Sequence, residues 1–274
     1  MNQEPARAAV HPRVSVSLIS AVRWTVAQNI SFLKASRIDA ISVNMMQLEP
    51  HAGQSIDQIN AAGLRTISIG TRGGSLIDSE AATFDVLRPA IDAAVALNCP
   101  AVFGVSGPAP SRMPTDQAFD RLAGTLGPAN SYARSKGVRL GLENSSAATR
   151  DKGFIHTLAD AVELSRACDV GIAVELQNCW YERHLPRLFR ENFDRFMVIQ
   201  CSDFVLGEDV RLNRRVPGDG SMPLEWMIGE LLEAGYAGYF DLEMIGPAIE
   251  QEGYASAIGR GVAWLSERLS SWGA

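Results

Sequence analysis

The sequence predicts an α/β protein built as a single (β/α)8 TIM barrel, and three observations support this fold class. Short β-branched, apolar runs alternate along the chain with longer stretches of helical period, which is the pattern of βα units. The chain has 274 residues, and one eighth of that is about 34, the length of one strand, one helix and two short loops. An open doubly wound sheet would need a glycine-rich phosphate loop after the first strand, where the chain has Ser20-Ala21-Val22. We expect one domain over residues 1–274, with 1–12 as a polar N-terminal tail.

The elements follow in order from this alternation. Each expected strand is a short apolar run, and the eight runs are Val14–Ile19, Ala40–Val43, Leu64–Ile69, Ala101–Val105, Val138–Glu143, Val170–Glu175, Phe196–Gln200 and Gly238–Glu243. Each expected helix has apolar residues at helical spacing, and Gly63 and Thr115 are typical of a C-terminal and an N-terminal cap. The helices are expected over Thr25–Ser36, Ser55–Ala62, Glu80–Leu97, Thr115–Ser135, Leu158–Cys168, Pro186–Asn192, Leu224–Ala234 and Ala255–Ser270.

Composition excludes several classes of function. The formal net charge is −6, so the chain lacks the basic surface that nucleic acid requires. The only lysines are Lys34, Lys136 and Lys152, and none lies in an expected strand, which argues against a Schiff-base enzyme. The four cysteines form no C-x-x-C pair, and no run approaches the roughly 20 apolar residues of a membrane span. We therefore expect a cytoplasmic protein that binds neither nucleic acid nor membranes.

Polar residues end four successive expected strands. These residues are Glu143, Glu175, Gln200 and Glu243, and they are separated by 32, 25 and 43 positions. In a (β/α)8 barrel such positions meet at the carboxyl-terminal mouth, where function resides. Three carboxylates brought together need a counter-charge, and an all-oxygen set suits a hard divalent cation. Mn2+ is the first expectation, with Mg2+ or Co2+ as alternatives, while the competing interpretation is that some of these are ordinary surface residues at strand ends.

The second half of the chain carries a series of motifs at the ends of its expected strands. They are Leu142-Glu143-Asn144, the run Gly171 to Asn178, Ile199-Gln200, Pro217-Gly218-Asp219-Gly220, and Gly235-Tyr236 through Leu242-Glu243. With these motifs the chain resembles the xylose-isomerase-like TIM-barrel superfamily, which includes sugar and sugar-phosphate isomerases and epimerases, hydroxypyruvate isomerase and inosose dehydratase. The resemblance implies that the four strand-end residues bind a metal, that Glu143 and Glu243 form the acid/base pair, and that the protein forms a homo-oligomer. The family usually has Asp followed three residues later by His on strand six, where this chain has Glu175 and Asn178.

These inferences combine into one leading hypothesis. The protein is expected to be a divalent-metal-dependent sugar isomerase/epimerase that acts on a small, polyhydroxylated carbonyl compound by α-proton abstraction and an enediolate intermediate. The residues expected to bind this carbohydrate-like substrate are Arg214 or Arg215, Asn178, His51 and Trp180. Two alternatives stay open: a lyase or dehydratase for a keto-sugar, keto-inositol or 3-oxo-glycoside at the same site, and a non-catalytic barrel subunit.

Overall fold

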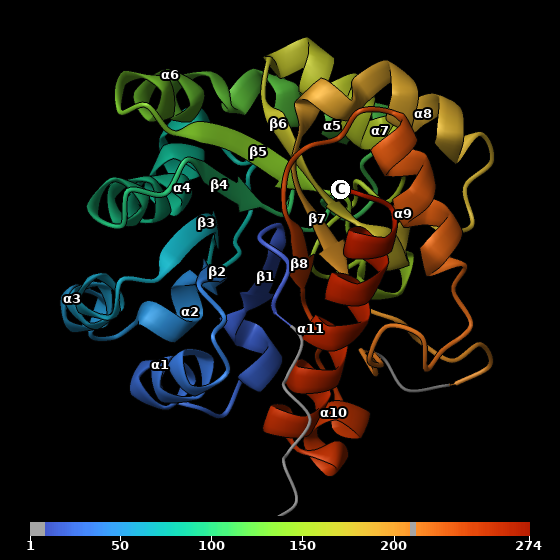
Figure 1. Cartoon of the computed structure of the whole chain (residues 1–274). Helices are drawn as coiled ribbons and strands as arrows, with labels where there is room; N and C mark the ends of the chain where they lie inside the picture. The colour runs from blue at the N-terminus through green and yellow to red at the C-terminus, as the bar shows by residue number, and fades with distance from the viewer. Residues whose placement is uncertain (1–8, 209–211) are drawn as a thin grey trace, which may run out of the picture.

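A closed parallel barrel forms the centre of the protein (Figure 1). The computed structural model describes residues 9–208 and 212–274. Its strands pair in chain order, and β8 returns to pair with β1. The strands are β1 (Val14–Ser17), β2 (Ala40–Asn44), β3 (Arg65–Gly70), β4 (Ala101–Gly104), β5 (Arg139–Glu143), β6 (Gly171–Glu175), β7 (Phe196–Cys201) and β8 (Phe240–Leu242). The predicted (β/α)8 fold is therefore confirmed.

Helices surround the barrel and cover its outer face (Figure 1). They are α1 (Val26–Ala35), α3 (Ala52–Ala62), α4 (Glu80–Ala96), α5 (Thr115–Thr125), α6 (Gly127–Ser135), α7 (Leu158–Cys168), α8 (Leu185–Asn192), α9 (Leu224–Glu233) and α11 (Tyr254–Ser271). Two short helices, α2 (Met45–Leu48) and α10 (Pro247–Glu252), lie in connections where the sequence predicted none. Within the described residues, no helix is both long and apolar enough to cross a bilayer.

Two predicted elements differ from the structure for local reasons. The expected helix Thr115–Ser135 is two helices, because Pro128 lies in the first turn of α6 and cannot continue the hydrogen bonding of α5. The first strand ends at Ser17, since Leu18–Ala21 form a 3-10 turn.

The N-terminal tail expected over 1–12 is wrong for its last residues. His11 is buried, its backbone N–H donates to Ser266 Oγ at 3.1 Å, and its Nε2 lies 2.8 Å from the carbonyl oxygen of Ala274. The chain just before β1 is therefore fixed against α11, and residues 1–8 lie outside the described residues.

The inner face of the barrel positions the functional residues. A small apolar cluster from five strands packs together, with Ala40, Ile67, Phe103, Ala173 and Val198 as its buried members. Side chains along a strand alternate between the two faces, so residues two positions further on share the inner face. Glu175 follows Ala173 and Gln200 follows Val198 in this way, which directs both side chains into the barrel.

Candidate active site

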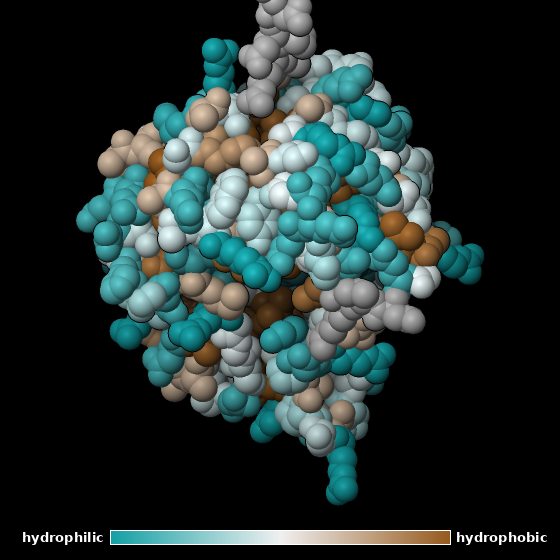
Figure 2. Space-filling view, turned by 90° about the horizontal axis from the view of Figure 1, so that it is seen from below, coloured by the Kyte–Doolittle hydropathy of each residue, from teal (hydrophilic) through white to brown (hydrophobic). Residues whose placement is uncertain are grey.

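A cavity of about 800 Å3 lies where the strands end. Its wall includes the last residues of several strands, namely Asn44, Gly70, Gly104 and Glu143. Figure 2 shows one face of the molecule, where a hollow with hydrophobic residues in its depth lies among mostly hydrophilic side chains. The cavity therefore lies at the carboxyl-terminal mouth, where (β/α)8 barrels bind their ligands.

The four strand-end residues come together, but at two depths. Glu143 and Glu243 line the cavity, whereas Glu175 and Gln200 are fully buried and do not reach it. The strand register places Gln200 between Glu175 on β6 and Asp241 on β8, two positions before Glu243. The two residues expected to transfer protons therefore face the ligand space, and the other two lie behind them.

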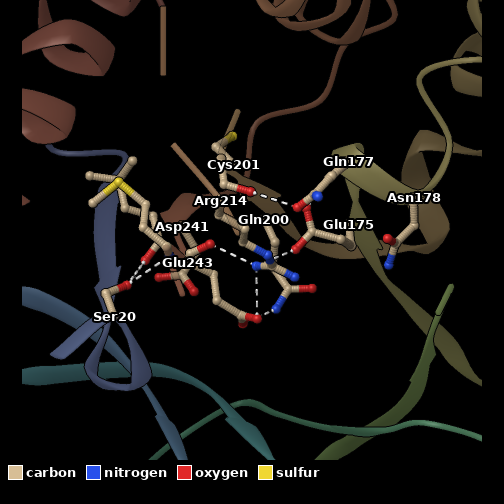
Figure 3. Close-up of polar contacts among 12 residues, drawn as sticks. Ser20, Glu175, Gln177, Asn178, Gln200, Cys201, Arg214, Asp241 and Glu243 are labelled. Carbon is tan, nitrogen blue, oxygen red and sulfur yellow. Dashed lines mark hydrogen bonds and ion pairs between the residues drawn. The ribbon is translucent and has the colours of Figure 1, made fainter. Parts of the chain in front are cut away.

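Arg214 connects the two depths. Its Nη1 lies 2.8 Å from Glu175 Oε2 and 3.0 Å from Glu243 Oε1, and it also donates to the Glu243 backbone carbonyl at 2.6 Å. Figure 3 shows the guanidinium between the two carboxylates. The Arg214 side chain is 5% exposed, so its charge is compensated by these carboxylates rather than by water.

Gln200 binds the second carboxylate of this group. Its Nε2 donates to Glu243 Oε2, and its Oε1 is buried without a hydrogen-bond partner among the described residues. Glu175 uses its other oxygen within its own turn, since Oε1 accepts from the backbone N–H of Gln177 at 3.1 Å.

Burial dominates the ionisation of the carboxyl groups. It raises the pKa of Glu143 well above the usual value, and the neighbouring charges of Glu243 and Glu175 raise it further. Burial also raises the pKa of Glu175 to about 7, although Arg214 acts in the opposite direction. For Arg214, burial opposes the charge, but the surrounding carboxylates outweigh it and raise the pKa. Burial thus favours the protonated form of Glu143.

Asp241 is a buried carboxyl group that the sequence analysis missed. Ser15 and Ser42 each donate a hydroxyl hydrogen bond of 2.6 Å to it, one to each oxygen. Burial raises the pKa of Asp241 to about 7, and the two serines counteract this only in part. The available signal was a charged residue inside the apolar run Phe240-Asp241-Leu242.

The loop that carries Arg214 folds around Asp203, a second residue that sequence reasoning missed. The buried Asp203 carboxylate accepts four backbone N–H groups, from Phe204, Met222, Gly218 and Gly220, at 2.9 to 3.1 Å. A Cβ on Gly220 would lie 2.2 Å from Asp203 Oδ1, so only glycine fits there. The Pro217-Gly218-Asp219-Gly220 motif is therefore a structural device that closes this loop.

A second close contact holds the Arg214 backbone against the chain after β8. The Arg214 N–H donates to the Ile245 carbonyl at 2.9 Å. Next to it, Gly246 has φ of 136°, and a Cβ there would lie 2.3 Å from the Leu212 carbonyl oxygen. Glycine at this position lets the two segments touch, which aims the Arg214 side chain into the barrel mouth.

The residues predicted to bind substrate have different places in the structure. Arg214 lines the cavity, whereas Arg215 does not line it and pairs with Glu208, so Arg214 is the one of the two that reaches the cavity. Asn178 and Trp180 line the cavity, and Asn178 Nδ2 also donates to the Asn144 carbonyl at 2.7 Å. His51 is exposed at the start of α3 and does not line the cavity, because α2 intervenes between β2 and this residue. Arg215 and His51, both predicted to bind substrate, therefore do not line the cavity.

The predicted metal ligands are neighbours but are not arranged around a common point. In the described ranges, no group of three or more His, Cys, Asp or Glu side chains is placed to hold a metal ion. The centre of the group is instead taken by the Arg214 guanidinium.

Comparison with known families agrees with the fold. The model of the xylose isomerase-like TIM barrel family matches residues 38–268. The chain belongs to this family. The match includes strands β2 to β8 and therefore all four strand-end residues, which confirms the resemblance noted from the sequence.

Solved structures of low sequence identity share the whole fold. A protein from Sinorhizobium meliloti 1021 is 19% identical, with a TM-score of 0.84 over 95% of this chain and 98% of its own. The IolI protein, solved with a bound zinc atom, is 13% identical with a TM-score of 0.79 over 95% and 99% of the two chains. The 3-keto-D-glucoside 4-epimerase of E. coli is 18% identical with a TM-score of 0.73 over 92% and 98%. No curated protein matches the sequence.

Proposed function

We propose that this protein is an isomerase or epimerase that moves a proton between carbons next to a carbonyl group of a small, polyhydroxylated substrate. The observation that carries the proposal is the pair Glu143 and Glu243, two carboxyl groups that face one cavity from β5 and from the end of β8. Such a reaction needs a base that removes the proton and an acid that returns one. Family membership and the epimerases among the structural neighbours support the same class of reaction.

The two carboxyl groups differ in the way the reaction requires. Burial raises the pKa of Glu143 and so favours its protonated form, and Glu143 has no hydrogen bond or ion pair to any other described residue. Glu243 is held between Arg214 and Gln200, with each of its oxygens in contact with a donor. In this proposal Glu243 removes the α-proton, and Glu143 delivers one to the neighbouring oxygen or carbon. Arg214, which lines the cavity, stabilises the negative charge that develops on the substrate oxygen.

The divalent cation predicted from the sequence, Mn2+ first, would be held by Glu143, Glu175, Gln200 and Glu243. The residues do not fit a cation in the present arrangement, because Arg214 Nη1 contacts Glu175 and Glu243 and the Gln200 amide nitrogen faces Glu243. Each step above is therefore assigned to side chains of the chain alone. The expected homo-oligomer remains a prediction.

Proton exchange in D2O tests the proposal directly. The purified protein is incubated in D2O with a panel of ketoses and keto-inositols, and loss of the α-proton signal is followed by NMR. We expect exchange with at least one compound, and a loss of at least about 100-fold in Glu143→Gln and in Glu243→Gln, the range of general acid–base catalysis. Glu230→Gln is the matched control, because Glu230 pairs with Arg190 away from the cavity. Exchange at the wild-type rate in both active-site variants would exclude the assignment.

A second candidate is elimination from a 3-oxo-glycoside after the same proton abstraction. The observation that favours it is the cavity itself, whose volume of about 800 Å3 is near the upper end for small-molecule sites and leaves space beyond one sugar ring. Phe103, Trp180 and Phe204 give this space apolar walls that suit an apolar group joined to the sugar. Mass analysis separates the candidates, because elimination releases the attached group and isomerisation leaves the mass unchanged.

A further inference from the structure

The oxygens assigned to a divalent cation already surround a cation that belongs to the chain. Arg214 Nη1 lies 2.8 Å from Glu175 Oε2 and 3.0 Å from Glu243 Oε1. A metal ion bound to both oxygens would have to lie about 2.0–2.2 Å from each, and Nη1 already lies against both. A divalent ion beside the guanidinium would also be strongly repelled in so buried a place. The metal ion and the present position of Arg214 therefore exclude each other.

The Arg214 guanidinium is fixed in this position from both sides. Its side chain is 5% exposed and the Glu175 side chain is 0% exposed, so separating them would leave two buried charges without partners. The Arg214 backbone is held by the Ile245 carbonyl and by the close approach of Gly246. This is a built contact rather than a surface side chain resting in a vacant space.

The residue types fit this contact as well. Glutamate at position 175 is one methylene longer than aspartate, and its two oxygens have separate partners in the Gln177 N–H and Arg214. Gln200 donates its amide N–H to Glu243, which holds that carboxylate next to Arg214. Asn178 donates to the Asn144 carbonyl, so its side-chain nitrogen is also engaged within the protein.

We propose that Arg214 takes the place of the divalent cation, so that the protein works without a metal and its guanidinium supplies the positive charge at the barrel mouth. This rests on the proposed proton transfer for its role in catalysis. A guanidinium has five N–H donors, and Nη1 is the nitrogen used by Glu175 and Glu243. Arg214 also lines the cavity, so its positive charge is next to the oxyanion that forms when Glu243 removes the α-proton. Glu175 and Gln200 are then positioning residues, which hold Arg214 and Glu243 in place.

Calorimetric titration of the full-length chain with Mn2+, after removal of bound metals with a chelator, tests this without any substrate. We expect the wild-type protein to bind Mn2+ at least 100-fold more weakly than Arg214→Met, because that variant leaves three neighbouring carboxyl groups without a counter-charge. Arg214→Lys, which keeps a charge, and Arg215→Met, which changes the arginine outside the cavity, should resemble the wild-type protein.

One stoichiometric Mn2+ with a micromolar or lower Kd in the wild-type protein, and no tighter binding in Arg214→Met, would overturn the proposal. If Arg214→Met does not fold, the wild-type titration decides: one tightly bound Mn2+ overturns the proposal, and weaker than millimolar binding supports it. Because no substrate is present, the result is independent of whether the proton-exchange experiment succeeds. Unchanged exchange by the wild-type protein in excess chelator adds a second supporting readout, and exchange abolished by chelator and restored by Mn2+ would contradict the proposal.

Discussion

The loop around Asp203 gives the sharpest test of how the site is positioned. Asp203 is 1% exposed, and its carboxylate accepts N–H groups from Phe204 and Met222 on one oxygen and from Gly218 and Gly220 on the other. Its backbone also pairs with that of Arg215 through hydrogen bonds of 2.9 and 2.6 Å, next to Arg214. This single carboxylate therefore organises the connection that delivers the arginine to the barrel mouth.

Asp203→Asn keeps the shape of the side chain but replaces one acceptor oxygen with an NH2 group. Two of the four N–H groups then lose their acceptor and face a donor. A hydrogen bond to a charged group contributes about 1.5–3 kcal/mol, so we expect a loss of at least about 3 kcal/mol of unfolding free energy. At roughly 2 °C per kcal/mol for a chain of this size, the melting temperature should fall by about 6 °C or more.

Asp219→Asn in the same loop is the matched control. Asp219 lies 2.6 Å from Arg260 through each of its oxygens, but both side chains are at least one-third exposed. Exposed ion pairs contribute about 0–1 kcal/mol, so this variant should stay close to the wild-type protein. Denaturant unfolding, monitored by circular dichroism, measures the stability of both variants. Equal midpoints for the two variants would refute the role assigned to the Asp203 carboxylate.

Three further predictions concern the cavity and its surroundings. Gly246→Ala should be at least about 1 kcal/mol less stable than Gly253→Ala by denaturant unfolding. Both glycines have positive φ, but a Cβ at 246 meets the Leu212 carbonyl whereas a Cβ at 253 has open space. Equal losses of stability in the two variants would contradict the close approach at Gly246. Burial raises the pKa of Asp241 to about 7, whereas an aspartate in an unfolded chain has a pKa of roughly 4. The folded state therefore binds this proton more tightly, and the contribution of Asp241 to the free energy of unfolding falls as the pH rises from 4 to 7. Asp241→Asn should therefore lose less stability between pH 5 and pH 8 than the wild-type protein, and parallel pH profiles would rule out the raised pKa. Trp180→Ala should weaken binding of an apolar glycoside by roughly 10-fold or more in a fluorescence-independent titration, since an aromatic contact and its buried area are lost; unchanged affinity would place the ligand elsewhere.

The fold could be predicted because its signals are local. Each strand is a short apolar run and each helix has a helical period, and these patterns depend on near neighbours along the chain. One error has a local cause, since Pro128 divides a predicted helix, and another has a distant one, since His11 is bonded to α11 more than 250 residues away in sequence. A contact of that separation leaves no mark in the apolar pattern near residue 11.

The part of the candidate site that lies at the strand ends could be predicted from the sequence. Glu143, Glu175, Gln200 and Glu243 meet because strand ends converge in a closed barrel, and the alternation of side chains directs them inward. The sequence left open whether Arg214 or Arg215 enters the cavity, because adjacent residues in a loop without regular period can point in either direction. It depended on Asp203 and on Gly246, whose contacts join the loop after β7 to itself and to the chain after β8.

The sequence by itself determined the architecture, the mouth of the barrel as the candidate site, and the four polar residues that converge there. Only the tertiary structure decided their depth and their partners: Glu143 and Glu243 face the cavity, and Arg214 lies between Glu175 and Glu243. The physical reason is that strand period and strand order fix the direction in which a side chain leaves the barrel wall. The counter-charge of buried carboxylates is set instead by whichever cationic group the folded chain brings within about 3 Å, which sequence spacing does not encode.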